Sequence, residues 1–236
     1  MSPERPGGGR ADASLIFPFQ TNFWLSPPRS HERPARGEDS HVVNPPLPAD
    51  RPDRLPAPAP PRIPSGGRRE LGLFGSLFCK IAARIWGVPQ IHLFTVFAQH
   101  RRLFWSWAPF GGVLLRRGRL PGCDTEVVIL RVGHVRNCEY ELQQHRRIAL
   151  TRGVEPGTVA AVFAWPESVG LSLRHQALLS AVDELLATRT VSDESWQRLA
   201  GHLDHRQLIE FVMLVGQYDA LAMWLNTLGV PMDYPD

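Results

Sequence analysis

Residues 126–145 read EVVILRVGHVRNCEYELQQH, an apolar run that passes directly into a polar, helix-forming run. The pattern predicts one helix over about 124–135 and a second over about 138–151, with a break near Asn137. The first helix is apolar on nearly every side and is therefore expected to lie in the core. These two neighbouring helices predict a helical domain built around this stretch.

Apolar residues recur at helical spacing on both sides of this stretch, and no run shows the alternation of a strand. Pro109 or Gly111–Gly112 is expected to kink the third helix. The last helix is apolar on much of its surface, which predicts burial on several sides and a homo-oligomer interface. The sequence therefore predicts an all-α domain, with further helices at about 70–85, 91–99, 101–115, 155–165 and 171–188, one beginning at Ser192, and one at about 204–228.

The composition divides the chain into two parts. Residues 1–69 hold most of the 22 prolines and almost no periodic apolar pattern. Such a composition buries too little apolar surface to offset the entropy lost on folding. We therefore expect a disordered Pro/Arg-rich tail over 1–65 and one helical domain over 66–236.

Charge and cysteine content exclude several classes of protein. The formal net charge of +3 lies entirely in residues 1–69, so a neutral folded domain gives no electrostatic case for binding nucleic acid. The apolar stretch 15–25 is short and contains a proline, which argues against a signal peptide or a membrane span. Three cysteines without a secretory signal favour a reducing compartment. We predict a cytoplasmic protein that binds neither nucleic acid nor membrane.

Four residues form the candidate catalytic site. Cys138, Glu141 and His145 stand at i, i+3 and i+7 of the second helix and share one face, onto which Glu126 can fold back. A thiol at a helix N-terminus is expected to have a lowered pKa, although a lone cysteine is as readily a small core residue. His145, four residues after a carboxylate, can act as a base or can lie in a basic surface turn. Glu126 can equally be an N-terminal cap.

Metal and cofactor sites are not expected. His134 together with Cys138, Glu141 and His145 offers metal-ligand residue types, but the predicted break near Asn137 would scatter them. The glycines at 111–112 and 118 lack the pattern of a phosphate-binding loop. The sequence therefore predicts no metal and no organic cofactor.

The segment from Glu126 to His145 resembles the carboxymuconolactone decarboxylase and alkylhydroperoxidase-D-like (AhpD-like) family. The similarity extends over about 60–233 and includes four separate segments in order, 62–64, 124–131, 204–210 and 225–230. The resemblance implies an AhpD-like helical bundle that assembles as a homo-oligomer.

The resemblance implies two chemistries. In redox members a glutamate, a Cys-x-x-Cys pair and a histidine act together, and Glu126, Cys138 and His145 match them, but Glu141 replaces the second cysteine. Peroxidase activity would then rest on Cys138 and an external thiol reductant. In the lactone decarboxylases, a carboxylate four residues before the histidine resembles Glu141 and His145.

Three hypotheses follow from the sequence. The first is a cofactor-free acid/base enzyme, a decarboxylase or isomerase of a small carboxylic acid or lactone, with His145 as acid/base and Glu141 and Glu126 assisting. The second is a single-cysteine, thiol-dependent peroxidase (peroxiredoxin activity) with Cys138 as nucleophile. The third is a non-catalytic oligomeric binding protein whose tail docks partners. Both enzyme hypotheses imply a small-molecule substrate.

Overall fold

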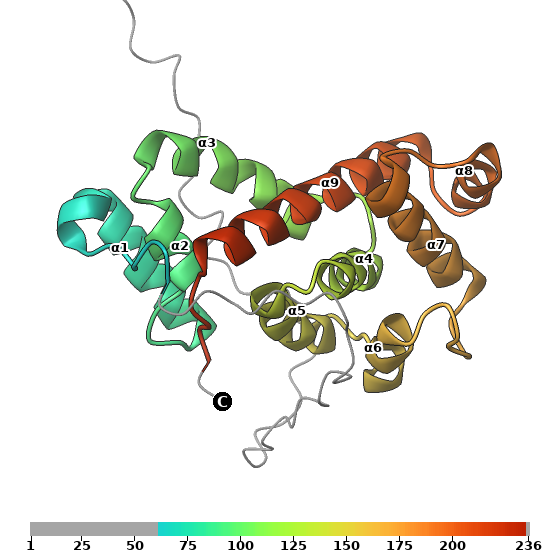
Figure 1. Cartoon of the computed structure of the whole chain (residues 1–236), viewed down its shortest axis with the longest axis horizontal. Helices are drawn as coiled ribbons and strands as arrows, with labels where there is room; N and C mark the ends of the chain where they lie inside the picture. The colour runs from blue at the N-terminus through green and yellow to red at the C-terminus, as the bar shows by residue number, and fades with distance from the viewer. Residues whose placement is uncertain (1–60, 235–236) are drawn as a thin grey trace, which may run out of the picture.

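The computed structural model describes residues 61–234, and within this range the chain is helical and contains no strand (Figure 1). The all-α prediction is confirmed. The helices are α1 (Arg68–Trp86), α2 (His92–Phe97), α3 (Arg101–Gly112), the π-helical segment η2 (Val113–Arg117), α4 (Gly122–Val135), α5 (Glu139–Thr151), α6 (Pro156–Phe163), α7 (Leu173–Thr188), α8 (Asp193–Ala200) and α9 (His205–Leu228).

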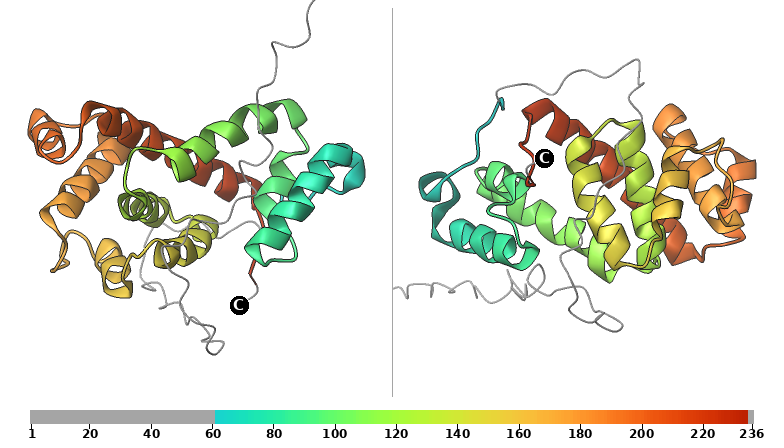
Figure 2. Two further views of the ribbon diagram at one scale, coloured as in Figure 1. Left: turned by 180° about the vertical axis from the view of Figure 1, so that it is seen from behind. Right: turned by 90° about the horizontal axis from the view of Figure 1, so that it is seen from below.

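Helix α4 is the centre of the domain. Every residue from Asp124 to Gly133 is buried, as expected for a helix that is apolar on nearly all sides. It packs against α5, α6, α7 and α9, and the views in Figures 1 and 2 show these helices arranged around it. The apolar run that dominates the sequence is therefore the core helix, and α5 lies directly against it.

Most helix ends fall where turn-forming residues predict them. Gly87 adopts the left-handed conformation that ends α1, and the Ser192 side chain accepts a hydrogen bond from the Ser195 amide at the start of α8. Of the two positions predicted for an irregularity in the third helix, Pro109 and Gly111–Gly112, the structure shows a change of helical geometry only at the second. The helix runs through Pro109 and changes to π-helical geometry only after Gly112.

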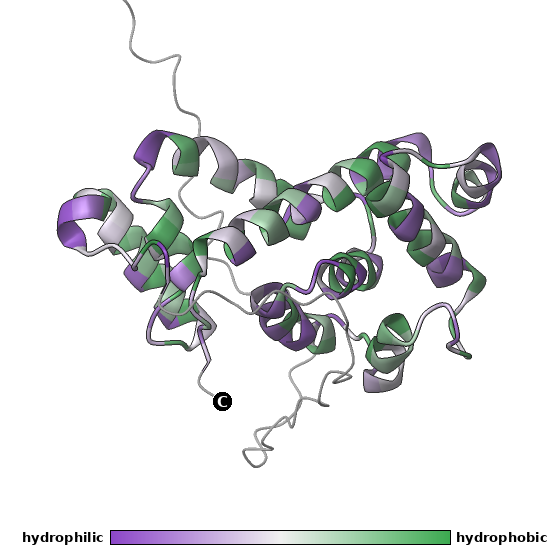
Figure 3. Ribbon diagram, in the orientation of Figure 1, coloured by the Kyte–Doolittle hydropathy of each residue, from purple (hydrophilic) through white to green (hydrophobic). Residues whose placement is uncertain are grey.

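Helix α9 crosses the molecule, and hydrophobic residues recur along its whole length (Figure 3). Its length and composition meet the criterion for a membrane span, but 56% of the relevant window is buried inside the domain. Core helices meet the same criterion. The side chains of Ile209, Val212, Met213 and Met223 remain exposed, and the homo-oligomer interface at this helix stays a prediction.

The link between η2 and α4 is attached to α9 through Glu210. Its carboxylate accepts hydrogen bonds from the backbone amides of Arg119 and Leu120. Gly118 permits this contact, because a Cβ at position 118 would lie 1.9 Å from Glu210 Oε1. A glycine is therefore required here for close approach to a buried carboxylate.

The start of the described range already contacts the domain. The Arg62 amide donates to the Leu228 carbonyl oxygen, and the Gly66 amide donates to the Thr95 carbonyl oxygen. The predicted tail over 1–65 therefore has its last residues against α9 and α2. Residues 1–60, and with them the rest of the predicted tail, lie outside the described residues.

The end of the described range is held by the carboxylate of Asp233. Its two oxygens accept four hydrogen bonds, from the amide and Nδ1 of His92, the hydroxyl of Tyr140 and the side-chain amide of Gln144. Tyr234 adds a contact, since the guanidinium of Arg147 lies 3.9 Å from its ring centroid. The segment after α9 is thereby fixed to α2 and α5.

Candidate active site

The site is built where α4 and α5 approach each other closely. A Cβ at Gly133 of α4 would lie 3.2 Å from the Leu142 side chain and 3.4 Å from Glu141 Oε2. The chain turns at Asn137, whose φ of 52° is one that asparagine tolerates better than most residues. This turn directs α5 back along α4, so that the predicted stripe on α5 faces the core.

Glu126 and His145 are brought together as predicted. Glu126 Oε2 lies 2.8 Å from His145 Nδ1, and both side chains are buried. The guanidinium of Arg152 lies 3.0 Å from the other carboxylate oxygen. Glu126 forms no helix cap, because α4 begins four residues earlier at Gly122. The carboxylate therefore fixes one ring nitrogen of His145 and leaves Nε2 for other partners.

Glu141 lies in the same pocket as His145, but in a different electrostatic setting. The residue is 2% exposed, and neither carboxyl oxygen has a hydrogen-bond partner among residues 61–234. Burial, with a smaller contribution from the negative charge of Asp219, raises the pKa of Glu141 well above its ordinary value. Burial therefore favours the neutral, protonated form of the Glu141 carboxyl group, which can donate a proton.

Cys138 differs from its predicted state. It is the N-cap of α5, as expected, but it is fully buried in the hydrophobic core between α4, α7 and α9. Burial, followed by the nearby Glu141 carboxyl, raises the pKa of the Cys138 thiol well above its ordinary value. The prediction of a lowered thiol pKa is wrong, and Cys138 does not line the pocket that Glu141 and His145 share.

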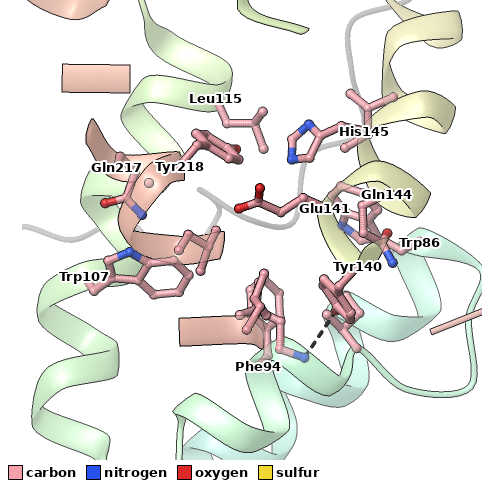
Figure 4. Close-up of a pocket in the computed structure, with 16 residues that line it drawn as sticks. Trp86, Phe94, Trp107, Leu115, Tyr140, Glu141, Gln144, His145, Gln217 and Tyr218 are labelled. Carbon is pink, nitrogen blue, oxygen red and sulfur yellow. Dashed lines mark hydrogen bonds between the residues drawn. The ribbon is translucent and has the colours of Figure 1, made fainter. Parts of the chain in front are cut away.

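The pocket beside Glu141 and His145 is enclosed largely by aromatic and aliphatic side chains (Figure 4). About 70 Å³ is open to the centres of water molecules. Several elements contribute the walls, and α5 and α9 face each other across the space. The lining residues are Trp86, Ile91, Leu93, Phe94, Trp107, Gly111, Leu115, Tyr140, Glu141, Gln144, His145, Ile148, Gln217, Tyr218, Leu221 and Leu225.

Several of these residues were missed by sequence reasoning. Tyr218 of α9 packs edge-on against the His145 ring, with ring centroids 5.1 Å apart. Gln217 stands beside it, and Trp107 of α3 lies on the same side of the pocket (Figure 4). No spacing rule connects α3, α5 and α9, so only the tertiary fold could identify these partners.

The metal set considered from the sequence does not form. His134 lies near the end of α4 and stacks on Phe163, and the turn at Asn137 separates it from the three candidate residues at the start of and within α5. A different group, Cys123, Asp124 and His175, brings ligand-type atoms within 4.8 Å of one another. The Asp124 carboxylate there is already paired with Arg174, at 2.7 Å and 2.6 Å from its two guanidinium nitrogens. This group is therefore explained as an ion-pair network.

Comparisons with known proteins identify one family model and several proteins that this chain resembles. Residues 101–184 match the model of the carboxymuconolactone decarboxylase family, a segment that contains all four candidate residues. The uncharacterized protein YdfG of Bacillus subtilis is 24% identical over 109 residues, which are 45% of this chain and 71% of that protein.

Two crystal structures share the fold. One is an uncharacterized peroxidase-related protein from Ralstonia eutropha with an alkylhydroperoxidase AhpD core, at a TM-score of 0.65, 15% identity and 73% coverage of this chain and 92% of that one. The other is a protein of unknown function from Agrobacterium tumefaciens, proposed as the antioxidant defence protein AhpD, at a TM-score of 0.52, 15% identity, and 56% and 92% coverage. Residues 101–184 are therefore similar to the carboxymuconolactone decarboxylase family, and the described domain shares the helical fold of two AhpD-like structures.

Proposed function

We propose that this protein is a cofactor-free acid/base enzyme that transfers a proton at a carbon adjacent to, or conjugated with, a carbonyl group. One observation carries the proposal. His145, whose ring is held by the buried Glu126, and Glu141, whose pKa is raised by burial, line one apolar pocket, so that a base and an acid can act on the same substrate. Pairs of titratable groups with contrasting environments are typical of such chemistry.

Each residue has a distinct role in the proposal. The Glu126 carboxylate accepts the Nδ1–H of His145, which leaves the lone pair of Nε2 to act as the base. Glu141 donates its proton, or a hydrogen bond, to the carbonyl oxygen as negative charge develops there. The enclosing aromatic side chains exclude water and strengthen both interactions.

The proposed isomerisation has two proton transfers. His145 removes a proton from the carbon next to the carbonyl, and the electron pair of the C–H bond forms an enolate whose oxygen is stabilised by Glu141. The protonated His145 then returns the proton to a conjugated carbon. In a decarboxylation His145 enters the reaction protonated at Nε2. The C–C bond to the carboxylate breaks, CO₂ leaves, the electron pair of that bond forms an enolate, and His145 delivers its proton to the carbon. Neither route needs an oxidant or a reductant.

The competing single-cysteine peroxidase is less well supported by the geometry. Such an enzyme needs an accessible thiolate, whereas the Cys138 sulfur is fully buried, has a raised pKa and lies outside the pocket lining. The Ralstonia eutropha protein of similar fold is called peroxidase-related, and the experiment therefore includes this activity.

The test measures proton exchange and peroxide consumption in the same protein. The protein is incubated in D₂O with carboxymuconolactone and with a panel of cyclic enones, and deuterium incorporation and CO₂ release are followed. We expect His145→Ala to lower the exchange rate by about 10²- to 10⁴-fold, while Cys138→Ala retains it. A parallel assay follows loss of cumene hydroperoxide with dithiothreitol. Two results together would overturn the proposal. The first is deuterium exchange that is absent or that is equally fast in His145→Ala, and the second is peroxide loss that depends on Cys138.

A further inference from the structure

The pocket contains polar atoms that the protein itself leaves without partners. Besides both carboxyl oxygens of Glu141, these are Nε2 of Gln217 and the indole nitrogens of Trp86 and Trp107, none of which has a hydrogen-bond partner among the described residues. Unpaired polar atoms cost free energy when buried, and native structures contain few of them. Their concentration around one cavity indicates that a ligand or water supplies the missing partners.

The unpaired atoms lie on two sides of the pocket. Figure 4 shows the Gln217 amide and the Trp107 indole side by side on one wall, while the Glu141 carboxyl points across the pocket toward that side. A tryptophan N–H can only donate, and the Gln217 Nε2 also donates. The protonated Glu141 adds an O–H donor. The pocket therefore offers hydrogen bonds to an oxygen that accepts them.

The charge of the lining argues against an anionic ligand. Among the described residues that line the pocket there is no lysine or arginine. Two guanidinium groups contact residues in or beside the lining, Arg152 on the Glu126 carboxylate and Arg116 over the Trp86 ring, but neither residue lines the pocket. A carboxylate transferred into this space would lose its hydration without gaining a cation, which costs several kcal/mol or more. It would also stand beside Glu141, whose own ionisation is disfavoured by burial.

The size of the cavity limits the ligand. A space of about 70 Å³ open to water centres is well above the minimum for a single water and is nevertheless compact. This corresponds to one five- or six-membered ring with an attached oxygen. The walls that would face the ring are Phe94, Leu115 and Tyr218, which suit an apolar, flat molecule.

We infer that the substrate is an uncharged cyclic carbonyl compound, an enone or lactone without a free carboxylate, whose carbonyl oxygen accepts hydrogen bonds from Trp107, Gln217 and Glu141. The inference rests on the proposed function and narrows it, because it selects isomerisation of a neutral ring over decarboxylation of a lactone acid.

Binding is measured separately from turnover, with three ring compounds of matched size. These are cyclohex-2-enone, cyclohex-1-ene-1-carboxylate and cyclohexene, which present a neutral acceptor, an anion and no acceptor. Dissociation constants are obtained near neutral pH by ligand-observed NMR with the full chain. We expect the enone to bind at least about tenfold more tightly than the carboxylate, since only the carboxylate is desolvated without a cation.

Variants locate the binding groups. Gln217→Leu and Trp107→Phe are each expected to weaken enone binding about tenfold and to leave cyclohexene binding unchanged. Gln197→Leu and Trp105→Phe are the matched controls, because neither residue lines the pocket, and both should bind like the wild type.

The outcomes separate the inference from the proposed chemistry. Carboxylate binding that equals or exceeds enone binding overturns the inference, and so does a failure of all three compounds to bind at millimolar concentration. An effect of Gln197→Leu equal to that of Gln217→Leu overturns it as well. Enone binding with the expected variant pattern but without deuterium exchange supports the inference and contradicts the acid/base function. Deuterium exchange that occurs only with carboxylate substrates supports the acid/base function and contradicts the inference of an uncharged substrate.

Discussion

Glu141 is the residue whose chemistry depends most on its surroundings. It stands one turn before His145 on the same helix, yet it has no charge partner among residues 61–234, whereas the carboxylate of Glu126 has two. Because desolvation favours its neutral form, folding raises the affinity of the Glu141 carboxyl group for a proton. The same protonation therefore affects both the stability of the fold and the acid role proposed for Glu141.

Replacement of Glu141 by glutamine is expected to remove a pH dependence of stability. The folded-state pKa of Glu141 is raised above the ordinary 4.5, so the folded state holds a proton that the unfolded state has released. The stabilising contribution is complete below about pH 4.5 and is lost as pH rises through the folded-state pKa, at about 1.4 kcal/mol for each pH unit. Urea unfolding of Glu141→Gln at about pH 5 and about pH 8 should show a smaller decrease than the wild type.

The exposed Glu167 provides the control for this experiment. Glu167→Gln should leave the pH dependence of the wild type intact. If Glu141→Gln and the wild type lose equal stability between the two pH values, Glu141 is ionised in the folded protein, and its assignment as the acid is wrong.

Cys138 shows where reasoning from residue type was insufficient. Its position at the start of α5 was predicted correctly, and a helix dipole there favours a thiolate by about 0.3–1 kcal/mol. Complete burial opposes this with shifts of up to several pKa units, each about 1.4 kcal/mol, and desolvation therefore dominates. The sequence indicates helix position well, but it does not show which side of a helix start is covered by other elements.

At the scale of the helices, the connection between Gly118 and α9 gives a sharp prediction. Gly118→Ala would place a methyl group on the Glu210 carboxylate, which must then release the amides of Arg119 and Leu120. We expect a loss of about 2–4 kcal/mol in the free energy of unfolding, measured by denaturant titration, because buried amides lose a charged acceptor.

A matched glycine lies on the same helix as Glu210. Gly216 sits inside α9, and a methyl group added there would meet open space, so Gly216→Ala should be neutral or stabilising by up to about 1 kcal/mol. Equal effects of the two substitutions would show that the Glu210 contact contributes nothing.

Helix positions were predictable because their signals are local. Apolar spacing and capping residues such as Gly87 and Ser192 placed the helices within a few residues of their observed bounds. The glycines at 111–112 indicated an irregularity at the end of the third helix, but not that it would take π-helical geometry. The stripe containing Glu141 and His145 was found because both lie on one helix.

At the scale of the whole molecule, the Asp233 carboxylate holds the segment after α9 against α2 and α5. Asp233→Ala would leave the His92 amide, the Tyr140 hydroxyl and the Gln144 amide without their acceptor. We expect a loss of about 2–4 kcal/mol in urea unfolding and, because Tyr140 and Gln144 line the pocket, weaker binding of the ring compounds. Asp193→Ala, at an exposed position in α8, should change stability by less than about 1 kcal/mol. Unchanged stability in Asp233→Ala would show that these hydrogen bonds do not hold the segment after α9 against the domain.

The pocket as a whole was beyond prediction from the sequence. Its walls come from α1, α2, α3, η2, α5 and α9, and its lining runs from Trp86 to Leu225. The long-range contacts that assemble it are specified by shape and packing density, which no periodicity in a single chain encodes. The fold class and the resemblance to the family whose model matches residues 101–184 could be inferred from residues 126–145, whereas the wall that α9 contributes to the pocket required the structure.

Because α9 covers α4 and supplies one wall, it has a consequence for biosynthesis. The ribosome produces the N-terminal elements first, so α4 and α7 emerge before the helix that shields them. Until α9 has been synthesised, the nascent polypeptide therefore exposes the apolar surfaces of α4 and α7 that α9 later contacts, and it lacks the cavity that would hold a small molecule. A small molecule that occupies this pocket can therefore stabilise the protein only after α9 has docked.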